Sequence, residues 1–243
     1  MKLKMLTRMA AMVAAGSLVV GLLAGCSVIP SKDGAADNAV ATDTALIITQ
    51  GDGMPALTNA EEFLNSVNVT PGGSAGLVVA DGKPFALGPQ RFDQVKNNDI
   101  QQARADKTAR YQLVEAVQGA AATTPETDLI SAISLASRML SAGTADNKVL
   151  IIRHSGVNTA VASLPMQDLD PAQLLDQLDA AAMVPQLNGV PVEFYGLGDV
   201  AGSQGTLSAQ QVQWLKSFWQ GFFDRTGANV TFHTDIVSGD ALN

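Results

Sequence analysis

Val149-Leu150-Ile151-Ile152-Arg153 is a run of four branched apolar residues that ends in a charged one. Strands with apolar residues on both faces are typical of a sheet that helices cover on both sides. Similar runs occur along the chain, separated by longer segments of helical pattern: Ala45 to Thr49, Gly76 to Ala80, Val190 to Tyr195 and Val230 to His233. Strands that alternate with helices predict an α/β three-layer sandwich with a mainly parallel central sheet.

The segments between these runs carry signals that start helices. Thr124-Pro125 and Asp170-Pro171 each place a capping residue before a proline, which is favoured in the first helical turn. Ser208 and Gln211 have the spacing of a capping box, and Gly227 suits the end of this last helix. These signals predict where the last three helices begin.

One further strand is predicted at the edge of the sheet. Lys83 to Leu87 is expected to pair with Gly76 to Ala80 across the tight turn Asp81-Gly82. No internal repeat and no change of composition interrupts the chain beyond residue 44. We therefore predict a single α/β domain over residues 45–243.

The first 25 residues have the features of a secretory signal peptide. They contain Lys2, Lys4 and Arg8, no acidic residue, and an apolar stretch from Met9 to Leu23. That stretch is shorter than the roughly 20 predominantly apolar residues that a stable transmembrane helix needs. Residues 1–25 are therefore predicted to direct export and to be removed.

The signal segment ends in Leu23-Ala24-Gly25-Cys26, which closely resembles the lipobox of bacterial lipoproteins. The resemblance implies cleavage before Cys26, a diacylglycerol on its thiol, and a mature protein anchored on the extracytoplasmic face of a membrane. Residues 26–44 are mostly small and polar, so we expect a flexible tether. Because Cys26 is the only cysteine, disulfides, thiol catalysis and cysteine-bound metal are excluded from the domain.

The charge of the mature chain argues against nucleic acid as a partner. The whole sequence has 15 Lys and Arg residues against 23 Asp and Glu, and removal of residues 1–25 leaves 12 against 23, a net charge near −11. An acidic surface repels phosphate backbones and anionic lipid headgroups. The membrane is therefore reached through the lipid, and a protein or cell-wall partner is expected.

Two stretches resemble von Willebrand factor A domains. One runs from Thr127 to Ile133 and on to Lys148 to Ile152, and the other is Val192 to Gly198. As an order of elements the resemblance covers residues 45–235. The chain is also similar to degenerate A-like domains that precede OmpA-like peptidoglycan-binding modules in envelope proteins. The resemblance implies a Rossmann-like sandwich of the kind predicted above.

At the positions of the family's cation site, the residues of this chain differ from the family's pattern. The family carries Asp-x-Ser-x-Ser after the first strand, a threonine on a second loop and an aspartate after a later strand, oxygen ligands that suit Mg²⁺. Here the first position reads Thr49-Gln50-Gly51-Asp52-Gly53, without the serines, and the third reads Arg153-His154-Ser155-Gly156, without the acid. Only Thr127, at the position of the family's threonine, matches the pattern. We therefore predict the fold without its metal, and no cofactor.

Other chemical motifs are incomplete. Gly196-x-Gly198-x-x-x-Gly202 departs from the spacing of a dinucleotide-binding loop. His154 and Ser155 are adjacent, so on an extended chain they point to opposite faces and do not form a base and a nucleophile. No G-x-S-x-G motif is present. These observations predict that the protein is not an enzyme.

The candidate ligand-binding residues lie in loops after strands or before helices, where open α/β sheets place ligands. They are Asp52, Thr127, His154, Ser155 and Asp199. We expect a non-enzymatic binding or scaffold module of the cell envelope, whose face comprises residues 50–55, 154–158 and 198–205. The alternatives are a small-molecule receptor of the solute-binding lipoprotein type and, less favoured, a degenerate hydrolase.

Overall fold

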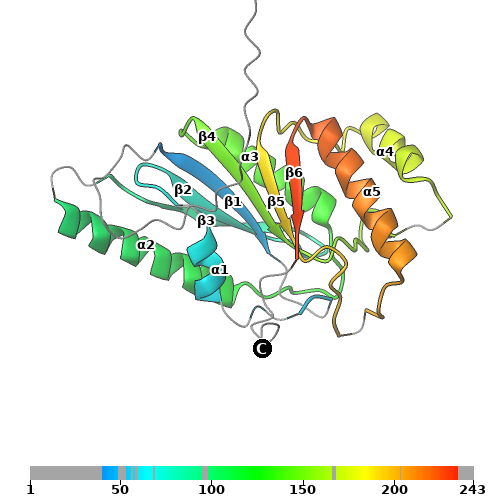
Figure 1. The fold of residues 1–243 in the computed structure, drawn as a ribbon, viewed down its shortest axis with the longest axis horizontal. Coiled ribbons are helices and arrows are strands. Elements are labelled where there is room, and N and C mark those ends of the chain that lie inside the picture. Colours follow the sequence, from blue (N-terminus) through cyan, green and yellow to red (C-terminus); the bar gives the residue numbers. More distant parts are fainter. Residues whose placement is uncertain are drawn as a thin grey trace, which may run out of the picture. The chain divides into compact units, whose positions relative to one another are not determined.

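The computed structural model describes residues 40–48, 53–55, 57, 60–67, 69–94, 98–165, 168–202 and 204–234. The predicted signal peptide, Cys26, most of the predicted tether and Asp52 lie outside these ranges. The described residues form a sheet of six strands with helices on both faces (Figure 1). Along the chain the strands are β1 (Thr42–Ile48), β2 (Ser74–Val79), β3 (Phe85–Arg91), β4 (Asn147–Arg153), β5 (Pro191–Tyr195) and β6 (Asn229–His233).

The strands are ordered β3-β2-β1-β4-β5-β6 across the sheet. β1 pairs in parallel with β2 and β4, and the pairs β4-β5 and β5-β6 are also parallel. The edge strand β3 runs antiparallel to β2. The prediction of a mainly parallel sheet is confirmed. The predicted edge strand is present too, although it starts at Phe85, opposite Val79, and continues to Arg91.

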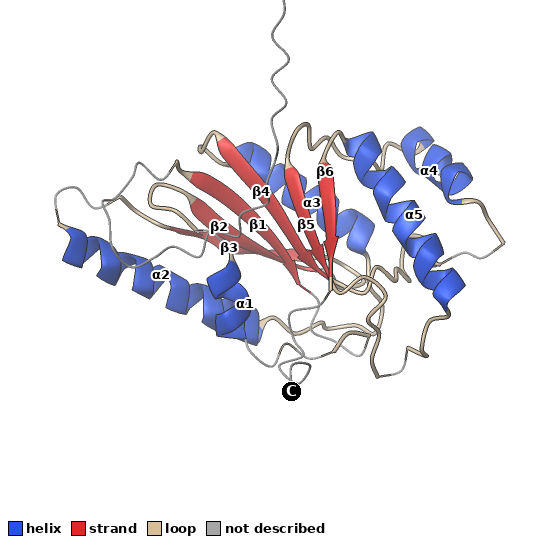
Figure 2. Ribbon diagram, in the orientation of Figure 1, coloured by secondary structure: helices blue, strands red, loops and turns tan. Residues whose placement is uncertain are grey.

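Helices cover both faces of this sheet, as Figure 2 shows. The cluster on one face includes α3 (Leu129–Ala142), α4 (Pro171–Ala180) and α5 (Ala209–Thr226), and the other face carries α1 (Ala60–Ser66) and α2 (Asp99–Gly119). On β1, Ala45 and Ile47 belong to the first apolar cluster, whereas Leu46 and Ile48 belong to the second. This alternation follows from the strand geometry and produces the predicted three-layer sandwich.

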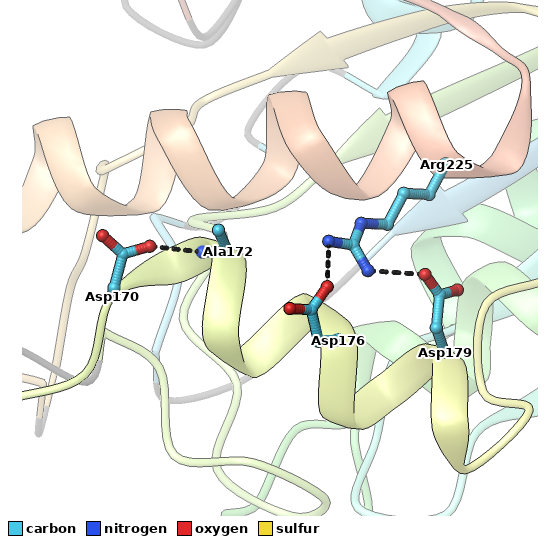
Figure 3. A network of polar contacts seen from close by, with 5 residues as sticks. All are labelled: Asp170, Ala172, Asp176, Asp179 and Arg225. Carbon is cyan, nitrogen blue, oxygen red and sulfur yellow. Dashed lines mark hydrogen bonds and ion pairs between the residues drawn. The ribbon is translucent and has the colours of Figure 1, made fainter.

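Three of the helix-end signals are confirmed. The Asp170 carboxylate caps α4 by accepting a hydrogen bond from the backbone N–H of Ala172, at 2.7 Å (Figure 3). Ser208 and Gln211 form the capping box of α5. Gly227 ends that helix in the left-handed conformation, with φ of 76°. Among the described residues, no helix has the length and apolar character needed to span a membrane.

The predicted start of α3 at Thr124-Pro125 is wrong. The helix begins at Leu129, and Asp128 caps it by accepting a hydrogen bond from the backbone N–H of Ser131, at 2.9 Å. The backbone N–H and the hydroxyl of Thr124 donate to the Asp81 carboxylate instead. That bond holds the chain before α3 in a loop.

β1 begins three residues before the apolar run that predicts it. The buried carboxylate of Asp43 accepts hydrogen bonds from the Ser74 hydroxyl at 2.6 Å and from the backbone N–H of Ala145 at 2.8 Å. These partners satisfy a charged group that would otherwise be costly to bury. Residues 42–44, which we expected in the tether, therefore belong to the sheet.

Candidate functional site

The carboxyl ends of the parallel strands meet at one edge of the sheet, and four of the five predicted site residues lie on loops there. Thr127 precedes α3, His154 and Ser155 follow β4, and Asp199 lies in the loop after β5. The structure brings Thr127 and His154 into contact. Asp199 is exposed and lies outside this buried contact. Asp52 falls outside the described residues.

His154 is 1% exposed, and both of its ring nitrogens are hydrogen-bonded. The backbone N–H of Gly156 donates to Nδ1 at 2.9 Å, so Nδ1 is the acceptor and Nε2 carries the proton of the neutral ring. Nε2 donates to the Thr127 hydroxyl at 2.9 Å. That hydroxyl donates in turn to the carbonyl oxygen of Ala80, at 3.2 Å. One chain of hydrogen bonds therefore joins the loops that follow β2 and β4 to the start of α3.

The surroundings of His154 keep its ring uncharged. Burial, together with the neighbouring charge of Arg153, lowers the pKa of His154 from 6.5 to about 3. Arg153 is itself fully buried, and its guanidinium donates to the carbonyl oxygen of Pro55, at 2.8 Å. A second positive charge beside this guanidinium is unfavourable in a medium of low dielectric constant.

Ser155 does not pair with His154. Its hydroxyl oxygen accepts a hydrogen bond from the backbone N–H of Val157, at 3.3 Å. Its carbonyl oxygen accepts one from the backbone N–H of Gly198, at 2.8 Å, which links the loops after β4 and β5. The two adjacent side chains thus have separate partners, so no base and nucleophile are formed.

Gly156 allows the tight turn that brings its N–H to the His154 ring. Its φ is +79°, and a Cβ at this position would lie 2.5 Å from Cδ1 of Leu197 and 2.9 Å from Nε1 of Trp219. The indole N–H of Trp219 donates to the Gly156 carbonyl oxygen at 2.9 Å. The turn therefore depends on the positive φ of Gly156 and on the hydrogen bond from Trp219 of α5.

Sequence reasoning missed Asp81, a carboxylate that is 1% exposed at the end of β2. It accepts hydrogen bonds from the backbone N–H groups of Gly82, Thr123 and Thr124 and from both threonine hydroxyls. Burial alone raises the pKa of Asp81, but these hydrogen bonds outweigh burial and hold the pKa well below its usual range. The carboxylate ties the loop before α3 to the end of β2.

Asn158 is a second buried polar residue that sequence reasoning missed. Its side-chain oxygen accepts a hydrogen bond from the backbone N–H of Leu129 at 2.7 Å, and its side-chain nitrogen donates to the carbonyl oxygen of Ala162 at 2.9 Å. It therefore caps α3 from a loop some 29 residues further along the chain. No local pattern marks these roles of Asn158 and Asp81, since the bonds that define them come from the start of α3 and from the loop before it.

The loop from Asn158 to Leu164 is held over the start of α3. The backbone N–H of Leu164 donates to the carbonyl oxygen of Asn158 at 2.7 Å and closes the loop. The N–H groups of Thr159 and Ala160 donate to the carbonyl oxygen of Thr127, at 2.9 and 3.2 Å. Val161, within this loop, is 42% exposed. The network thus fixes the loop that carries an apolar side chain at the surface.

A cavity of about 20 Å³ lies beneath these loops, with Met54, Thr127, His154, Ser155 and Gln204 in its walls. It has room for about one water molecule. A larger ligand at this edge would therefore contact the outer surface of the loops.

The described residues at this edge do not fit a divalent cation. Mg²⁺ requires several oxygen ligands in a near-octahedral arrangement. The Thr127 hydroxyl is already bonded to His154 and Ala80, and the ring presents an N–H toward it. Within the described ranges, no group of three or more His, Cys, Asp or Glu side chains is arranged to hold a metal.

No protein-family model and no curated protein sequence matches this chain. Solved structures do match it. One is a von Willebrand factor type A protein from Catenulispora acidiphila, with a TM-score of 0.43 and 14% identity over 81% of this chain and 39% of that one. A second holds three N-terminal domains of the type V pili tip protein Mfa5 from Porphyromonas gingivalis, with a TM-score of 0.39 and 13% identity over 79% of this chain and 42% of that one.

A third is the conserved hypothetical protein BatB from Bacteroides thetaiotaomicron, with a TM-score of 0.41 and 14% identity over 81% of this chain and 91% of that one. The chain spans about two fifths of the first two proteins and most of the third. At these identities, the similarity concerns the arrangement of helices and strands.

Proposed function

We propose that this protein is a non-enzymatic binding module of the cell envelope, with a von Willebrand factor A-like domain and a lipid anchor at Cys26. The observation that carries the binding role is the loop from Asn158 to Leu164. Hydrogen bonds to Thr127 hold this loop at the carboxyl edge while the Val161 side chain is exposed. A contact residue on a preorganised loop loses little conformational entropy on binding.

The use of the polar groups at this edge supports a non-enzymatic role. General bases and nucleophiles need a reactive atom that reaches the substrate. His154 has both ring nitrogens engaged within the protein, and the Asp81 carboxylate accepts hydrogen bonds from the loop before α3. These groups hold the loops together and leave their outer surfaces to make contacts.

Site-directed photo-crosslinking in the intact envelope tests the binding role. Benzoylphenylalanine would be placed at position 161, at position 199 in the loop after β5, and at position 147 as a control. Asn147 is exposed like Asp199, but it lies at the amino end of β4. We expect discrete crosslinked products from positions 161 and 199 only. Equal products from all three positions, or none from positions 161 and 199, would contradict the proposal.

A specific observation favours a second candidate function, that of a small-molecule receptor. A groove of about 420 Å³ lies at the amino ends of β1, β4 and β5, with Thr44, Asn147, Val149, Ile151 and Asn188 among its lining residues. Pockets of this size suit small ligands. Thr44 is 3% exposed, and its hydroxyl has no hydrogen-bond partner among the described residues. A ligand that supplied one would offset a cost of about 1–3 kcal/mol.

A thermal-shift screen of metabolites against the acylated protein tests the receptor role. We expect a bound metabolite to raise the melting temperature by several degrees, and the Thr44→Val substitution to remove most of that rise. Thr42→Val is the matched control, because the Thr42 hydroxyl already donates to the carbonyl oxygen of Val40. A screen with no hit would count against the receptor role and leave the crosslinking result unaffected.

A further inference from the structure

The third position of the A-like cation site is the place where this chain departs most from the family's pattern. His154 stands there in place of an acid, and it contacts Thr127, the one residue that matches the pattern. We infer that the neutral His154 ring takes the place of a divalent cation, so that the carboxyl edge is assembled without metal. The consequence for partners rests on the proposed binding role.

The donors and acceptors around the ring form a complete set. The Gly156 N–H fills the lone pair of Nδ1, the Nε2 proton points to the Thr127 hydroxyl, and the hydroxyl proton points to the Ala80 carbonyl oxygen. A cation beside Thr127 would meet the Nε2 proton and would have to displace a ring that is 1% exposed. The groups that a cation would need as ligands are therefore already hydrogen-bonded to one another.

The charge of Arg153 acts against a cation in the same place. This guanidinium is fully buried next to His154 in the chain and donates to the Pro55 carbonyl oxygen. Two positive charges at short range repel each other strongly when water is excluded. Carboxylates normally offset such repulsion around a bound cation. Among the described residues, two carboxylates are buried at this edge, those of Asp81 and Asp128. Asp81 is already surrounded by N–H and hydroxyl donors, and Asp128 accepts the N–H of Ser131 at the start of α3.

His154 also performs the positioning task that a bound cation would perform. Through its two nitrogens it connects the turn at Gly156 with the residue that precedes α3. Two backbone N–H groups of the loop that carries Val161 donate to the carbonyl oxygen of that residue, Thr127. If the edge is the binding face, partner binding there is independent of Mg²⁺ and Ca²⁺.

Selective labelling makes a direct test possible, since the chain has only two histidines. The acylated mature protein would be labelled with ¹⁵N-histidine, placed in detergent micelles and titrated with Mn²⁺, which broadens signals of nearby nuclei. His233, on β6, pairs with Glu193 at 2.5 Å and is partly exposed, so it reports non-specific binding to the acidic surface. We expect no saturable broadening of the His154 ring signals up to millimolar Mn²⁺.

Saturable broadening of the His154 signals at submillimolar Mn²⁺ that Thr127→Val removes would overturn the inference. Broadening of His233 alone, or weak and unsaturable broadening of both rings, supports it. Thr159→Val is the control for Thr127→Val. The Thr159 hydroxyl accepts a hydrogen bond from the backbone N–H of Thr127 and does not bond to the His154 ring.

The consequence for partners is measured with the position 161 crosslink in solubilised envelopes, with EDTA or with Mg²⁺. We expect the same yield in both. A crosslink that EDTA abolishes would refute metal independence and leave the binding role intact. The absence of any crosslink would refute the binding role, while the Mn²⁺ titration would still decide the construction of the edge.

Discussion

Folding lowers the pKa of His154 from 6.5 in the unfolded chain to about 3, because the ring becomes buried beside Arg153. Between these values the unfolded chain binds a proton that the folded chain does not, so stability falls as the pH falls. Asp81 acts in the same direction at still lower pH, because its folded-state pKa is depressed. We expect the free energy of unfolding, from urea titrations, to be lower at pH 4.5 than at pH 7.5 by about 2–3 kcal/mol.

His154→Gln identifies the residue responsible. Glutamine keeps an N–H donor for the Thr127 hydroxyl but has no group that titrates in this range. The variant should be less stable at pH 7.5, and it should lose much less stability on going to pH 4.5. His233→Gln removes the other histidine and is the control. If His154→Gln loses as much stability on acidification as the wild type, the assignment to His154 is wrong.

Gly156 is the residue at which the backbone conformation and the space available both require glycine. The Gly156→Ala substitution would place a Cβ against Leu197 and Trp219 at a φ of +79°. We expect a loss of about 1–3 kcal/mol in the free energy of unfolding, measured by urea denaturation. Gly119→Ala is the control, because nothing lies within 4 Å of a Cβ there. Equal effects of the two substitutions would contradict this account of the turn.

At the scale of elements, α4 and α5 are joined at the surface by Arg225. Its guanidinium bonds to the carboxylates of Asp176 and Asp179, at 2.6 and 2.5 Å, as Figure 3 shows. Exposed ion pairs of this kind contribute little, because water and salt screen them. We expect Arg225→Gln to lower the free energy of unfolding by less than about 1 kcal/mol, and by still less at 1 M salt.

The cap of α4 provides the comparison for this ion pair. Asp170→Ala removes the acceptor for the Ala172 N–H, and loss of such a cap typically lowers stability by about 1 kcal/mol at any salt concentration. Urea denaturation of both variants at low and high salt separates the two mechanisms. A salt-independent loss in Arg225→Gln that exceeds the loss in Asp170→Ala would refute the assignment.

The sequence predicts those elements whose signals are local. The buried apolar runs locate the parallel strands, and Asp170, Ser208 and Gly227 mark helix ends through contacts within a few residues. The starts of β1 and α3 depend on distant partners. Asp43 enters the sheet because it bonds to groups 31 and 102 residues away, and Thr124 stays out of α3 because it bonds to Asp81.

The candidate site shows the same division. Thr127 and His154 are predicted one by one, from their places relative to strands and helices. The contact between them forms only when the loops are packed together. The same holds for the roles of Asp81 and Asn158, because their hydrogen bonds join segments that are tens of residues apart. A buried polar network of this kind leaves no periodic pattern in the sequence, because each member is specified by groups in other loops.

At the scale of the whole molecule, the sequence predicts a lipid anchor at Cys26 and an acidic mature chain. A mature chain with a net charge near −11 has no electrostatic attraction to anionic headgroups, so the proposed attachment to a membrane depends on the lipid predicted at Cys26. A single acyl chain gives only marginal binding, whereas two or more give stable anchoring. The proposed diacylglycerol meets this requirement.

Cys26→Ser is therefore expected to abolish both lipid attachment and processing without disturbing the domain. Labelling with an alkyne fatty acid should mark the wild type and not the variant, and intact mass should show that the variant retains residues 1–25. The urea midpoint should be unchanged, because the described contacts of the domain begin at Val40. Lys83→Arg, an exchange of one cation for another, is the control for expression and labelling. A variant that is still labelled, or still cut before position 26, would show that Cys26 is not the anchor.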